Sequence, residues 1–82
     1  MTTLILNALA SRYQAELMAL QVNIENYTSN SVGVAEHPDI VTEVDKLIEQ
    51  VASAEEKLKI VSEMLEVEGM KDYGEDLSLI HI

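Results

Sequence analysis

The chain has 82 residues and carries 15 acidic against 5 basic side chains, so its formal net charge at pH 7 is −10. It contains no cysteine, which excludes disulfide bonds, thiolate metal sites and a cysteine nucleophile. Because contacts with phosphates or anionic lipids need clustered Lys and Arg, the charge balance argues against partners that are nucleic acids or membranes.

The first predicted element is an amphipathic helix over residues 3–27. Apolar side chains recur there at alternating intervals of four and three residues, which places them along one side of a helix. These positions are Leu6, Ala10, Tyr13, Leu17, Leu20, Ile24 and Tyr27. A sustained heptad of this kind makes that side a seam for a partner helix, as in a coiled coil.

The same segment carries a second apolar stripe on the side opposite the seam. Between residues 4 and 27 the only charged side chains are Arg12, Glu16 and Glu25. The interaction residues expected on this stripe, called the outer face below, are Leu4, Ala8, Ala15, Met18 and Val22. A helix that is apolar on two sides is usually buried on two sides, and one partner helix covers only one of them. We therefore expect a second copy of the chain, or a larger protein partner, to pack on the outer face.

A polar, turn-rich segment leads to a second predicted helix over residues 38–68. Pro38 fits the first helical position, where its missing N–H costs nothing, and Gly69 is placed to end the helix in a left-handed conformation. The apolar positions are Ile40, Val44, Leu47, Val51, Ala54, Leu58, Val61 and Leu65. Their heptad spacing predicts a second seam that faces the first one.

The side of the second helix opposite its seam is acidic. Glu49, Glu56 and Glu63 form a ridge, called the acid ridge below, that we expect to face solvent. Two helices share only one seam, and chains of about 80 residues or fewer often need oligomerisation to bury enough apolar surface. The predicted fold is therefore all-α, an antiparallel two-helix hairpin that forms a four-helix bundle on dimerisation.

The hairpin domain is expected to span residues 1–69, with an acidic tail over residues 70–82. Residues 77–82, with the sequence LSLIHI, differ from the rest of the chain and have no periodic partner upstream. This string resembles one translated reading frame of an adapter used in sequencing libraries. We therefore expect residues 77–82 not to be native, and we assign His81 no chemical role.

No constellation of residues points to catalysis or to a cofactor. The segment Glu36-His37-Pro38-Asp39 groups two carboxylates with an imidazole, but a metal site needs more converging ligands. The serines lack a nearby histidine that would activate them, and the isolated glycines form no phosphate-binding loop. No apolar run approaches the ~18 residues of a membrane span. We expect a non-enzymatic protein with no catalytic, cofactor-binding or metal-ligating residues.

One stretch of the chain covers about residues 26–60, and its most specific part is Val32-Gly33-Val34-Ala35-Glu36-His37-Pro38-Asp39. On these residues the chain resembles small proteins of marine tailed phages that have no established activity. It implies a phage origin and supplies no site residues.

Two functional hypotheses follow. The first is a protein–protein interaction module, a small phage accessory or structural protein that acts through the apolar faces of the first helix. The alternative is an acidic mimic of nucleic acid that inhibits a basic host or phage protein, since the chain is strongly acidic and carries the acid ridge. Either protein would act in the cytoplasm of the host cell or on the virion.

Overall fold

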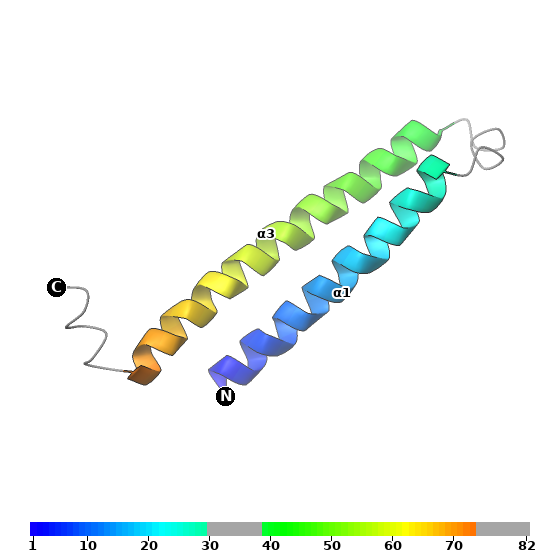
Figure 1. Ribbon diagram of the computed structural model, residues 1–82. Helices are drawn as coiled ribbons and strands as arrows, with labels where there is room; N and C mark the ends of the chain where they lie inside the picture. The colour runs from blue at the N-terminus through cyan, green and yellow to red at the C-terminus, as the bar shows by residue number, and fades with distance from the viewer. Residues whose placement is uncertain (30–38, 74–82) are drawn as a thin grey trace.

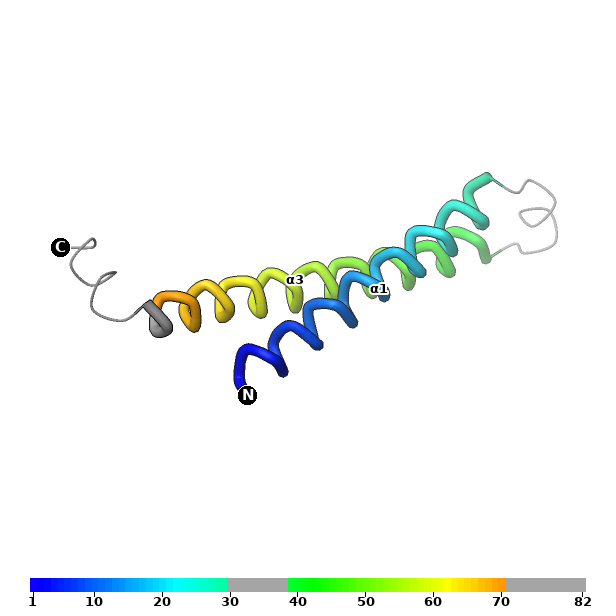
Figure 2. Tube along the Cα trace, turned by 60° about the horizontal axis from the view of Figure 1, so that its bottom comes forward, coloured from blue at the N-terminus to red at the C-terminus, as the bar shows by residue number. Residues whose placement is uncertain are grey.

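The computed structural model describes residues 1–29 and 39–73, and within them the side chains up to residue 70. Two helices, α1 (Thr2–Ser29) and α3 (Ile40–Tyr73), lie side by side and run in opposite directions (Figure 1). Figure 2, turned from the first view, shows the same pairing from the side and the two helices crossing at a shallow angle. The prediction of an all-α, two-helix hairpin is confirmed for these residues.

Both helices begin with a backbone carbonyl that accepts the first helical hydrogen bond. The Ile5 N–H donates to the Met1 carbonyl and the Glu43 N–H donates to the Asp39 carbonyl, each at 3.0 Å. Asp39 therefore occupies the N-cap of α3, a position that aspartate favours, and Glu43 lies in the first turn near the positive end of the helix dipole. The helix starts at Ile40, two residues after the predicted start, and Pro38 itself lies outside the described residues.

Both helices also continue beyond their predicted ends. In the last turn of α1 the Thr28 hydroxyl donates to the carbonyls of Ile24 (2.9 Å) and Glu25 (3.3 Å), so the threonine bonds within the helix. The expected end of the second helix at Gly69 is wrong, because α3 passes through this residue and runs to Tyr73. Gly69 is flanked by residues that tolerate a helix, and the penalty of about 1 kcal/mol for a helical glycine does not stop it. The first residues of the predicted tail are thus helical, while residues 74–82 lie outside the described part.

The core is a single line of side chains between the two helices. All of the predicted seam positions on α1 and α3 are buried or half-buried, which confirms both heptads. The side chains with the least exposure are Leu6, Leu20, Ala54 and Val61. Among the described residues no side chain is completely enclosed. Each helix therefore has one covered side, and everything else on it faces outward.

Replacing Gly69 with alanine should stabilise the hairpin by up to about 1 kcal/mol, because alanine has the higher helix propensity. A Cβ atom at this position would meet no other atom within 4 Å, so no clash opposes the gain. Urea unfolding followed by circular dichroism measures the effect. Ala52→Gly, at an exposed position in the same helix, is the matched control and should destabilise by a similar amount. A Gly69→Ala variant that is less stable than the parent chain would contradict a helical Gly69.

Candidate functional site

The outer face of α1 lies on the side of the helix that α3 does not cover. Leu4 is 69% exposed, Met18 68% and Val22 56%, and Ala8 and Ala15 between them are also exposed. The structure therefore places all five predicted interaction residues on one uncovered stripe. The two alanines at its centre leave the helix backbone accessible to close approach by another helix.

Charge is unevenly divided between the helices. Within α1 the charged side chains are Arg12, Glu16 and Glu25, which sum to −1, out of −10 for the whole chain. The acid ridge of α3, Glu49, Glu56 and Glu63, is exposed, as the heptad predicts. Two copies that meet through α1 would therefore bring together surfaces of low charge, with the repelling carboxylates kept outside.

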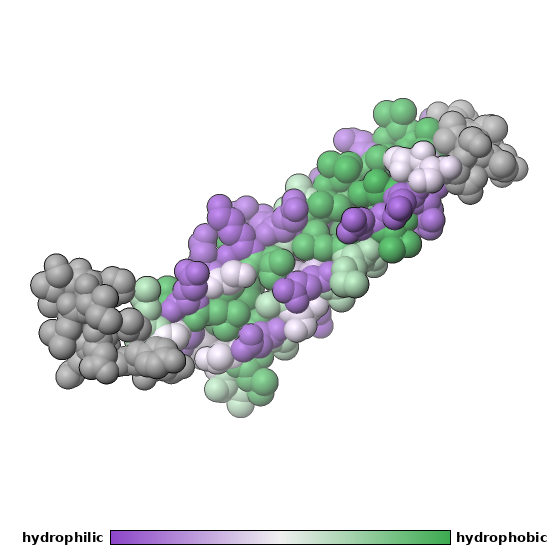
Figure 3. All heavy atoms as spheres, viewed as in Figure 1, coloured by the Kyte–Doolittle hydropathy of each residue, from purple (hydrophilic) through white to green (hydrophobic). Residues whose placement is uncertain are grey.

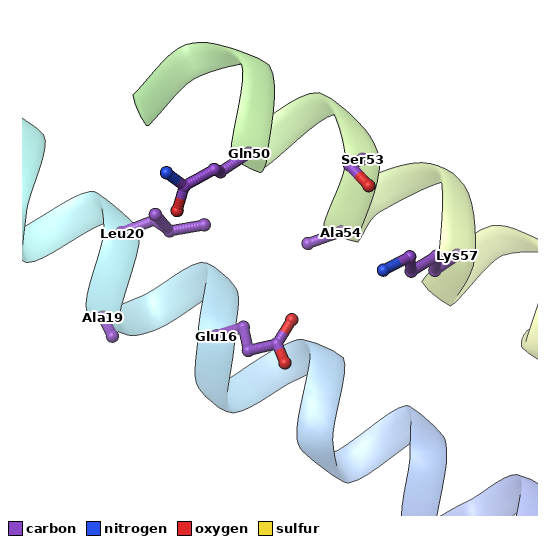
Figure 4. Close-up of a pocket in the computed structure, with 7 residues that line it drawn as sticks. All are labelled: Glu16, Ala19, Leu20, Gln50, Ser53, Ala54 and Lys57. Atoms are coloured by element: carbon purple, nitrogen blue, oxygen red, sulfur yellow. The ribbon is translucent and has the colours of Figure 1, made fainter. Parts of the chain in front are cut away.

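The heptad positions next to the seam show which residues of the two helices lie on the same side of the hairpin. When the seam positions are lettered a and d, positions g and c form one flank of each helix and positions e and b form the other. In the middle of the hairpin a groove opens between the helices, lined by Glu16, Ala19 and Leu20 of α1 and Gln50, Ser53, Ala54 and Lys57 of α3 (Figure 4). Its lining residues occupy g, c and d positions on both helices. The g and c flanks of the two helices therefore lie on the same side of the hairpin.

Four of the seven residues that line this central groove are polar. The Glu16 and Lys57 side chains reach into it from opposite helices (Figure 4). The Lys57 ammonium nitrogen lies 5.7 Å from the centre of the Tyr13 ring, a cation–π distance that places Tyr13 level with Lys57. The groove thus contains one carboxylate and one ammonium.

The structure also reveals apolar surface on α3 that the sequence interpretation missed. Two hollows lie at opposite ends of the hairpin. The loop-end hollow is lined by Tyr27, Thr28, Ile40, Val41 and Val44, and the open-end hollow by Ile60, Glu63, Met64, Val67 and Glu68. On the side shown in Figure 3, apolar residues gather toward the loop end and polar ones cover the middle of α3. In the sequence, this surface could have been recognised from apolar residues that stand next to seam positions, such as Val41 and Ile60. The many acidic residues of α3 made this pattern difficult to see.

The described residues carry no group of three or more His, Asp and Glu side chains that could hold a metal ion. His37, the only histidine of the grouped motif, lies outside them. Within this same part of the chain, neither helix contains a stretch apolar enough to cross a bilayer. The surface features that remain are the outer face, the acid ridge, the central groove and the two hollows.

Comparison with known proteins gives no relative: no family model matches the chain, and no curated protein or solved structure is significantly similar to it.

The contact between Tyr13 and Lys57 should contribute about 0.5 kcal/mol to hairpin stability, the value typical of an exposed cation–π pair. A double-mutant cycle with Tyr13→Leu and Lys57→Met measures it, because leucine is apolar but has no π face and methionine keeps an unbranched apolar chain without the charge. The same cycle with Tyr13→Leu and Lys46→Met is the control, since Lys46 pairs with Glu43 in the first turn of α3. Equal coupling in both cycles would mean that the cation does not act through the ring.

Proposed function

We propose that the chain functions by protein–protein association through the outer face of α1, and that its partner is a second copy with which it forms a four-helix bundle. The observation that carries this proposal is the uncovered apolar stripe from Leu4 to Val22 on a helix whose other side already packs on α3. Apolar helix faces of this length are stabilised when another helix covers them.

The amount of exposed surface supports the same conclusion. The chain exposes 6383 Å². A compact monomer of 9.1 kDa would expose roughly 4,900 Å², so the excess is about 1,500 Å². That excess is larger than the ~800 Å² that one partner contributes to a standard interface. The chain therefore exposes enough surface for a dimer of standard size.

The charge distribution favours a second copy on this face over one on α3. With a charge of −1 on α1, two outer faces can meet without strong repulsion, and the acid ridges stay in solvent. A larger protein with an apolar groove that accepts a helix would cover the same face.

If the resemblance to proteins of marine tailed phages reflects a shared origin, the module is a phage accessory or structural protein, found in the host cytoplasm or on the virion.

Met18→Glu, and separately Ala15→Glu, should weaken self-association at least tenfold, because each would bury an unpaired charge in the interface. Sedimentation equilibrium over a concentration series gives the dissociation constant, and circular dichroism should show that helicity is retained. Thr42→Glu adds the same charge at an exposed position of α3 and should leave association unchanged. A wild-type chain that stays monomeric and captures no protein partner would overturn the proposal.

The alternative function, an acidic mimic of nucleic acid, draws support from the exposed acid ridge. Under this alternative, the triple variant Glu49→Gln, Glu56→Gln and Glu63→Gln should weaken binding to a basic nucleic-acid-binding protein by tenfold or more. Affinity should also fall steeply as salt rises, since exposed charges are screened. Fluorescence anisotropy measures both effects. Binding that is insensitive to salt and is abolished by Met18→Glu would reject the mimic in favour of the outer face.

A further inference from the structure

Two charged side chains of α1 lie on or beside the outer face. The stripe advances by alternating steps of four and three residues, so the position that follows Val22 is Glu25, which is exposed. Arg12 borders the same stripe at a c position and is also exposed. Among the side chains that the structure describes, neither forms an ion pair within the single chain. Both charges are therefore free to act on the direction in which a second copy packs.

A parallel copy would bring like groups together. In a parallel pair that is in register, each residue of the stripe faces its own counterpart. The two Glu25 carboxylates would lie opposite each other, and Arg12 could not neutralise them, because it lies roughly 20 Å away along the helix at ~1.5 Å per residue. Met18 would also meet Met18 while Ala15 met Ala15, which gives layers of unequal width.

An antiparallel copy can pair small side chains with large ones. In one register, called the matched register below, Ser11 lies level with the partner's Val22 and Ala15 with the partner's Met18. Each of these layers combines a small and a large side chain, so the two helices can interdigitate at an even separation. The matched register also overlaps the two α1 helices along almost their whole length, so that most of each outer face is covered.

The matched register also brings opposite charges together. Arg12 lies about one helical turn, ~6 Å along the axis, from the partner's Glu25, a distance that its long side chain can span. Two-fold symmetry makes the contact twice. A shift by one heptad loses it: in one direction the two Arg12 side chains face each other, and in the other Leu4 and Ala8 extend past the end of the partner's α1.

We propose that two copies associate through the outer face as antiparallel α1 helices in the matched register, oriented by two ion pairs between Arg12 and the partner's Glu25. This inference rests on the proposed function and adds to it the orientation of the partner and two residues that determine specificity. The α1 helices lie at the centre of the dimer and the acidic α3 helices lie outside. The loop ends of the two hairpins lie at opposite ends of the dimer.

Cysteine crosslinking tests the orientation, because the chain contains no cysteine of its own. A Ser11→Cys chain and a mass-tagged Val22→Cys chain are mixed under reducing conditions to exchange subunits and are then oxidised mildly. The mixed disulfide should dominate. Each variant alone should crosslink little, since its two thiols would lie roughly 16 Å apart along the axis, too far for a disulfide. Efficient crosslinking of the Ser11→Cys variant with itself would show parallel packing and overturn the proposal.

Charge exchange tests the register. Arg12→Glu should weaken dimerisation by about fivefold or more, because two attractive contacts become repulsive. Adding Glu25→Arg should restore the dissociation constant to within about twofold of the parent value, since it re-forms both pairs. The matched control adds Glu16→Arg to Arg12→Glu. It has the same net charge, but Glu16 reaches into the central groove of its own hairpin, so affinity should not recover.

Sedimentation equilibrium of the four chains separates this inference from the proposed function. Equal recovery with Glu16→Arg and with Glu25→Arg would show that only net charge matters and would overturn the ion pairs. A dimer that is weakened by Met18→Glu, yet gives no mixed disulfide, would keep the proposed function and overturn the matched register. A parent chain that stays monomeric would overturn both.

Discussion

The single seam between two helices is the constraint on which the rest of this structure depends. Side chains project from each helix in all directions around its axis, but the one neighbouring helix covers only those at the a and d positions. The least exposed side chains, such as Leu6 and Val61, form one line, and no described side chain is fully enclosed. The hairpin consequently resembles one half of a helical bundle more than a closed globular domain. Its remaining surfaces, polar and apolar alike, are exposed in the single chain.

The two helices meet this constraint in different ways. On α3 the position opposite the seam repeats glutamate, which is fully compatible with water. On α1 the corresponding stripe is small and apolar, and it leaves side chains such as Met18 exposed. A strongly acidic chain can therefore still be suited to association, since its negative charge and its apolar outer face lie on different helices. Total charge governs long-range repulsion, but the local surface governs what can pack.

The flanks of the seam add a second level of organisation. The g and c flank is polar at the centre, around Glu16 and Lys57, and becomes apolar at the open end. The e flank has its apolar hollow at the other end, beside Val41. Apolar surface is thus distributed over both ends of the molecule and around α1.

Periodicity along the chain determined the two helices, their seam residues and the outer face, because each of these depends only on the 3.6-residue repeat of one helix. Helix ends were less predictable. Gly69 has the composition of a stop signal, yet α3 continues through it, since a single glycine costs less than the surrounding helical residues contribute. The central groove could be recognised only after the helices were paired. Glu16 and Lys57 are far apart in sequence, and only the antiparallel register of the seam brings them into the same groove.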